Sequence, residues 1–88
     1  MAYARLSPDY EHAYNAVMAE LRRYIRGSEC RVDEILEILS ALPSESVNSL
    51  LVQLRRNLEA WHYMGTITDE QYSRGLSKLE EIERLSKR

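Results

Sequence analysis

Apolar residues recur along this chain at intervals of three and four positions, which is the spacing of one face of an α-helix. The pattern predicts four helices, near residues 8–26, 33–42, 45–64 and 69–86, separated by short polar connections. No stretch alternates apolar and polar residues as a half-buried strand does. We therefore expect an all-α protein. Short loops favour antiparallel neighbours, so the fold should be a small antiparallel bundle of four helical segments, three long and one short.

Residue types at the predicted helix ends support this division. Ser7 is a candidate N-cap before Pro8, and Gly27 and Gly65 are candidate C-terminal stops. Pro43 disfavours helical geometry at the preceding residue and should end the second helix, with Ser44 capping the third. We expect each of the three glycines and two prolines to mark the start or the end of a helix.

The turn before the fourth helix carries the clearest local signal. Thr68 and Gln71 have the spacing of a capping box, in which side chain and backbone at the helix start bond each other reciprocally. Ile67 and Tyr72 have the spacing of the hydrophobic staple that accompanies such a box.

Residues 54–79, centred on the run GTITDEQY at 65–72, resemble the short C-terminal helical-hairpin family known as SHOCT. The likeness lies in a helix, a Gly-x-Ile-Thr turn, acidic or amide residues, an aromatic residue and a second helix. In that family the hairpin is usually a C-terminal appendage linked to oligomerisation. The resemblance therefore implies a hairpin that takes part in self-association.

Composition narrows the class of protein. The chain is 44% hydrophobic and 30% charged, which suits one soluble helical-bundle domain over residues 1–88. The net charge of −2 provides no overall basic field for a nucleic acid. Cys30 is the single cysteine and no apolar run approaches the length of a membrane span, so we expect a cytoplasmic protein without membrane contact.

Candidate chemistry is sparse. Glu59 with His62, and Asp9 with His12, each place a carboxylate and an imidazole three positions apart, as in di-iron helical bundles. One pair lies at the start and the other at the end of helices expected to run parallel, and His12 and Glu59 fall off the apolar stripes. These positions favour surface histidines over a metal-dependent dimeric enzyme. Arg31 beside Cys30 is a feature that lowers thiol pKa values, but nothing marks a general base. We assign no catalytic, cofactor-binding or metal-binding residue and predict a protein that is not an enzyme.

Aromatic content points to binding instead. The chain has six tyrosines, one tryptophan and no phenylalanine, and Tyr and Trp are enriched at partly exposed interfaces. The sequence thus predicts a small regulator, adaptor or inhibitor that binds another protein through a Tyr-rich helical face. The candidate partner-binding residues are Tyr10, Tyr14, Trp61, Tyr63 and Met64.

An alternative is a nucleic-acid-associated regulator. Its candidate basic patch is Arg22, Arg23, Arg26, Arg55 and Arg56. The competing explanation is that these arginines complement a helix C-terminus and solvate polar faces.

Self-association is a further expectation. A bundle with one short member should leave part of three long apolar stripes uncovered, and exposed apolar patches usually mark interfaces. Such uncovered surface predicts a symmetric homodimer that uses Tyr10, Tyr14, Trp61 or Met64.

Overall fold

A computed structural model describes residues 8–87 of the chain. They form four helices: α1 (Pro8–Ile25), α2 (Val32–Ser40), α3 (Ser44–Tyr63) and α4 (Asp69–Ser86). The bounds differ from the predicted ones by at most two residues, and these residues contain no strand. The prediction of an all-α bundle with three long helices and one short helix is confirmed.

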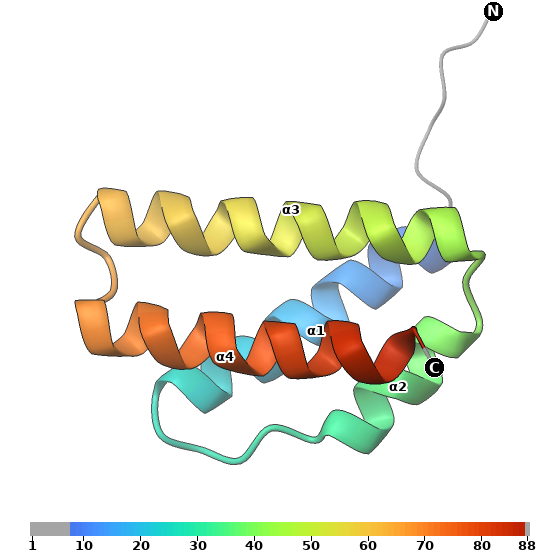
Figure 1. The fold of residues 1–88 in the computed structure, drawn as a ribbon, viewed down its shortest axis with the longest axis horizontal. Helices are drawn as coiled ribbons and strands as arrows, with labels where there is room; N and C mark the ends of the chain where they lie inside the picture. The colour runs from blue at the N-terminus through green and yellow to red at the C-terminus, as the bar shows by residue number, and fades with distance from the viewer. Residues whose placement is uncertain (1–7, 88) are drawn as a thin grey trace, which may run out of the picture.

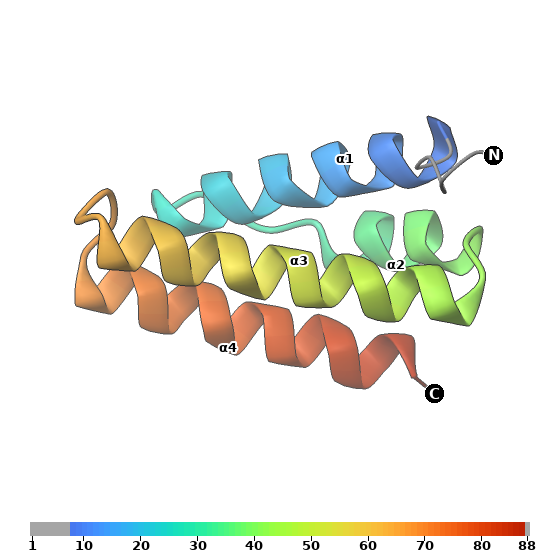
Figure 2. The same ribbon diagram turned by 90° about the horizontal axis from the view of Figure 1, so that it is seen from above.

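Consecutive helices run in opposite directions (Figures 1 and 2). α3 and α4 lie side by side as a hairpin, α1 runs parallel to α3, and the short α2 lies at the end of the bundle where α3 begins (Figure 2). α4 packs against all three of the other helices. α1 also contacts all three of the others, so α1 and α4 together join the bundle.

The core is apolar and contains no buried polar or charged side chain among the described residues. Every helix contributes to it. Its buried members are Tyr10, Ala13, Val17, Met18, Leu21, Ile25, Ile35, Leu39, Leu50, Leu51, Leu54, Leu58, Leu79 and Ile82. At about 25 cal/mol per Å² of apolar surface, burial of this set is the main stabilising contribution.

Gly75 lies in the middle of α4 and is buried, so the expectation that every glycine marks a helix end is wrong. A Cβ atom at this position would lie 3.2 Å from Ile25 Cδ1 and 3.2 Å from both methyl carbons of Leu58. The absent side chain allows the α4 backbone to approach α1 and α3 closely. Packing therefore outweighs the cost of about 0.5–1 kcal/mol that glycine carries inside a helix.

The other two glycines end helices as predicted. Gly27 and Gly65 have φ values of 104° and 79°, a region that favours glycine. After α3, Gly65 N–H donates to the His62 carbonyl (3.1 Å) and Thr66 N–H to the Trp61 carbonyl (2.8 Å), which is the Schellman pattern. The same pair of bonds follows α1, so both helices stop at defined positions.

The capping box at the start of α4 is confirmed. Gln71 N–H donates to Thr68 Oγ1 (3.1 Å), and Thr68 N–H donates to Gln71 Oε1 (2.9 Å). Ile67 and Tyr72 both pack against the core, consistent with the predicted staple. The predicted Ser7 cap lies outside the described residues.

The predicted Ser44 cap is wrong. Pro43 occupies the N-cap position with extended geometry (φ −61°, ψ 153°), and no side chain caps α3. Because Pro43 adopts this geometry, the helix begins one residue earlier than predicted, and Ser44 becomes its first helical residue.

The expectation of an uncovered apolar stripe is also wrong. Most stripe residues of α1 are buried within a single chain, and Tyr14 and Tyr24 are half-buried, because α4 contacts the other three helices at once. Among the described residues, the large hydrophobic side chains that stay exposed are Val52, Tyr63 and Met64, all on α3 or its C-cap. Exposed apolar surface is thus local rather than a continuous stripe.

We predict that Thr68→Ala lowers the free energy of unfolding by about 0.5–2 kcal/mol, because it removes the acceptor of the capping box. Ser44→Ala is the matched control: it also removes a hydroxyl at the start of a helix, but one that caps nothing. Urea denaturation of the two variants and the wild type measures the difference. Equal stability of all three proteins would show that the capping box is not stabilising.

We predict that Gly75→Val destabilises the protein by about 1–3 kcal/mol more than Ser77→Val, since overpacking forces neighbours out of their rotamers. Both changes place valine inside α4, but Ser77 is exposed. Thermal and urea unfolding of both variants provide the comparison. Similar losses would contradict the close approach of α4 at Gly75.

Candidate functional site

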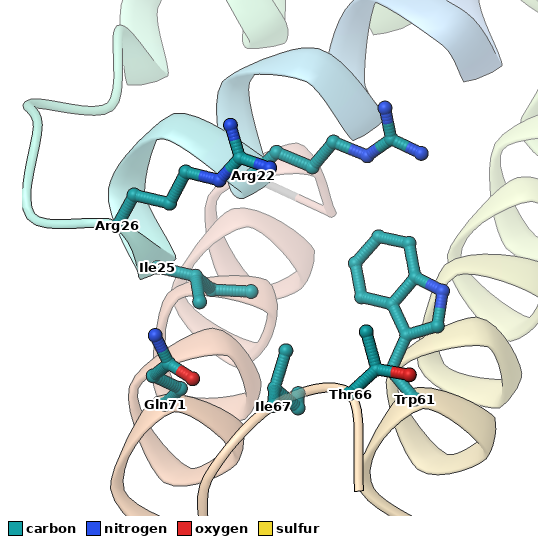
Figure 3. Close-up of a pocket in the computed structure, with 7 residues that line it drawn as sticks. All are labelled: Arg22, Ile25, Arg26, Trp61, Thr66, Ile67 and Gln71. Carbon is teal, nitrogen blue, oxygen red and sulfur yellow. The ribbon is translucent and has the colours of Figure 1, made fainter. Parts of the chain in front are cut away.

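A cleft of about 330 Å³ opens at the end of the bundle where α1 finishes and the α3–α4 turn lies. Three elements and the turn contribute its seven lining residues (Figure 3). They are Arg22 and Ile25 from α1, Arg26 directly after it, Trp61 from α3, Thr66 and Ile67 from the turn, and Gln71 from α4. We call this feature the basic cleft.

The local sequence explains how these side chains meet. Arg22 lies in the last turn of α1 and Arg26 directly follows the helix. Arg26 N–H donates to the Arg22 carbonyl (3.1 Å), which continues the helical turn and keeps the two residues on the same side. The Schellman motif at Gly65 turns the chain immediately after α3, which brings Thr66 and Ile67 beside Trp61. The capping box holds the Gln71 side chain at the opposite wall.

α4 also fixes the end of α1. Arg74 Nη2 donates to the carbonyl of Tyr24 (2.9 Å), and its guanidinium lies 4.6 Å from the centre of the Tyr24 ring. Lys78 Nζ lies 4.8 Å from the same ring. These contacts hold the C-terminal turn of α1, and with it Arg22 and Arg26, against the α3–α4 hairpin.

The basic cleft is positively charged. The Arg22 guanidinium lies 5.3 Å from the centre of the Trp61 ring, a cation–π arrangement. No carboxylate lines the cleft, and neither Arg22 nor Arg26 forms an ion pair with a described residue. The surface combines a flat aromatic ring, two guanidinium groups and apolar side chains.

Two of the residues predicted to bind a partner lie near this cleft. Trp61 is half-buried and lines it. Met64 is 68% exposed and follows Trp61 by three residues, so it lies on the same side of α3. Tyr63 is 92% exposed, but a two-residue offset places it on the opposite side of the helix.

The other two predicted residues lie elsewhere. Tyr10 is 7% exposed and is a core residue of its own chain, so little of its surface is left for a partner. Tyr14 is half-buried, and burial raises the pKa of its phenol. Both line a second cleft of about 390 Å³ near the start of α1, at the opposite end of the bundle from Trp61. The five predicted residues therefore do not form one surface.

The five predicted arginines are likewise divided. Arg22 and Arg26 line the basic cleft, whereas Arg55 faces α4 and pairs with Glu83 (3.5 Å). Arg23 and Arg56 are exposed and do not line the basic cleft.

His62 makes contacts within the bundle that the sequence did not predict. Its ring stacks on Tyr72 with the ring centres 4.3 Å apart, and its Nε2 lies 2.5 Å from Asp69 Oδ1. These contacts join the end of α3 to the start of α4.

His12 is exposed, and within residues 8–87 no three His, Cys, Asp or Glu side chains form a possible metal site.

Cys30 is half-buried between α1 and α2. Burial raises the pKa of its thiol; Lys78 opposes this change, while Glu20 and Glu81 add to it. Arg31, the neighbour considered as an activating charge, instead pairs with Glu34 (3.3 Å). The environment favours the protonated thiol, which is the poorer nucleophile.

Comparisons with protein-family models, curated proteins and solved structures found no match to this chain. The resemblance of residues 54–79 to the SHOCT hairpin therefore stays a prediction. Within the described part of the chain, no helix is both long enough and apolar enough to cross a membrane.

Proposed function

We propose that this chain is a non-enzymatic interaction module that binds a partner protein at the end of the bundle where the basic cleft opens. The observation that carries this proposal is the cleft in which Trp61 meets Arg22 and Arg26, with exposed Met64 three residues after Trp61 at the end of α3. Aromatic residues, Met and Arg are the types enriched at protein interfaces. Trp and Arg are also the commonest residues at binding hot spots.

The lining of the cleft supports binding rather than catalysis. It contains no carboxylate, imidazole or thiol that would act as a general base or as a nucleophile of the Cys type. Its side chains instead offer hydrogen-bond donors, a cation–π surface and apolar contacts. A regulator, adaptor or inhibitor requires nothing more from a site.

A different protein, rather than a second copy, is the partner we propose. The apolar stripes that motivated a homodimer are covered within one chain, so this argument for self-association no longer applies. Among residues 8–87, the large apolar side chains that remain exposed are too few for the large hydrophobic interface typical of an obligate dimer.

We expect Met64→Asp to abolish or weaken partner binding at least about tenfold, because a carboxylate is poorly tolerated in the apolar centre of an interface. Val52→Asp is the matched control, since Val52 is also an exposed apolar residue of α3 but lies three turns away. Both variants and the wild type are used as bait in extracts of the native host, and retained proteins are quantified by mass spectrometry.

The proposal requires a protein that is retained by the wild type and by Val52→Asp, but lost from Met64→Asp. Equal retention by all three baits would contradict it, as would the recovery of nucleic acid with no specific protein. Light scattering of the purified chain at micromolar concentration is the companion measurement, and a stable dimer that Met64→Asp dissociates would identify the partner as a second copy.

A further inference from the structure

The basic cleft leaves two guanidinium groups without a carboxylate partner in the described chain. Figure 3 shows Arg22 and Arg26 along one side of the cleft, with Thr66, Ile67 and Gln71 along the other. The Arg22 guanidinium lies beside the Trp61 ring. Stacking on an aromatic face limits the freedom of a long side chain, so less entropy is lost when the group binds a ligand.

Several other cations of the described chain are already engaged. The ion pairs are Arg31–Glu34, Arg55–Glu83, Lys78–Glu81 and Lys87–Glu83. Arg74 donates to a backbone carbonyl. No carboxylate lines the cleft, so its positive charge is not neutralised by a lining residue, although the chain as a whole carries a net charge of −2.

The apolar part of the cleft restricts the ligand further. Trp61 and Ile67 are half-buried and lie next to the two arginines, so a ligand that reaches both guanidiniums also covers apolar surface. Arg binds carboxylates through paired N–H donors, and the fork of one guanidinium fits one carboxylate. A ligand with carboxylates on either side of an apolar side chain matches this arrangement.

We propose that the cleft binds an acidic segment of the partner protein, with Asp or Glu carboxylates on Arg22 and Arg26 and an apolar side chain on Trp61 and Ile67. This inference rests on the proposed function and names the chemistry of the partner. A nucleic acid fits less well, because phosphate backbones are bound by a continuous track of cations. Here Arg55 is paired with Glu83, away from the cleft.

Selection from a library of random peptides displayed on phage tests this proposal directly. The immobilised bait is the full chain, as wild type, as the cleft variant Arg22→Gln/Arg26→Gln, or as the control Arg23→Gln/Arg56→Gln. The control removes the same amount of charge from exposed residues outside the cleft. Circular dichroism confirms that each bait is folded.

We expect the wild type and the control to enrich peptides that combine Asp or Glu with Leu or aromatic residues. The cleft variant should lose the acidic enrichment and bind a wild-type-selected peptide at least about tenfold more weakly, as expected for loss of two bidentate, charge-assisted contacts. Trp61 is the single tryptophan of the chain, so its fluorescence reports occupation of the cleft. The selected peptide should change this emission.

Several outcomes would overturn the inference. They are enrichment of peptides without acidic residues, equal affinity of the cleft variant and the wild type, and binding that leaves Trp61 emission unchanged. Failure of the wild type to enrich any peptide, or tighter binding of a single-stranded oligothymidine at the cleft, would also overturn it. The proposed function is tested separately, since loss of a partner from Met64→Asp does not depend on acidic residues in that partner.

Discussion

The close approach of α4 to α1 and α3 at Gly75 is the constraint on which the rest of this structure depends. A Cβ atom there would lie 3.2 Å from side-chain carbons of Ile25 and Leu58, so the space is available only because residue 75 lacks one. Ile25 also lines the basic cleft. Ile25 thus contacts α4 at Gly75 in the core and also contributes to the surface that we propose as functional.

Packing of α4 against three helices has a second consequence. It covers the apolar stripes of one chain from within that chain, and confines exposed large hydrophobic residues, among those described, to three positions of α3 and its C-cap. The turn between α3 and α4 determines the position of part of this exposed surface. Gly65 ends α3 directly after Met64, and the Thr68–Gln71 capping box starts α4 three residues later. Trp61 and Gln71, which line the basic cleft together with the end of α1, are therefore positioned relative to each other by bonds within the turn.

Local signals were sufficient for much of the fold. Helical periodicity predicted all four helices, and the stops at Gly27 and Gly65 and the box at Thr68 depend on residues close in sequence, so sequence reasoning found them. Gly75 was misassigned because its role depends on Ile25 and Leu58, which belong to other helices. Ser44 was misassigned because Pro43 supplies the N-cap geometry without a capping side chain.

The candidate site was only partly predictable for the same reason. Arg22 and Arg26, at helical spacing, and the single Trp61 were visible as candidates. That they share a cleft follows from topology, since α1 and α3 end at the same end of the bundle (Figure 1). The burial of a tyrosine and the ion pairing of an arginine depend on contacts between residues that are distant in sequence. Arg55, for example, pairs with Glu83, which lies 28 positions away. Sequence periodicity carries no information about such pairs.

The most direct test of this account is nuclear Overhauser spectroscopy of the methyl-labelled protein. If α4 approaches α1 and α3 at Gly75, the Gly75 α-protons will give strong cross-peaks to the δ1 methyl group of Ile25 and to both methyl groups of Leu58. A folded, helical protein that lacks these cross-peaks would contradict the arrangement, and with it the assembly of the basic cleft from α1, α3 and the α3–α4 turn.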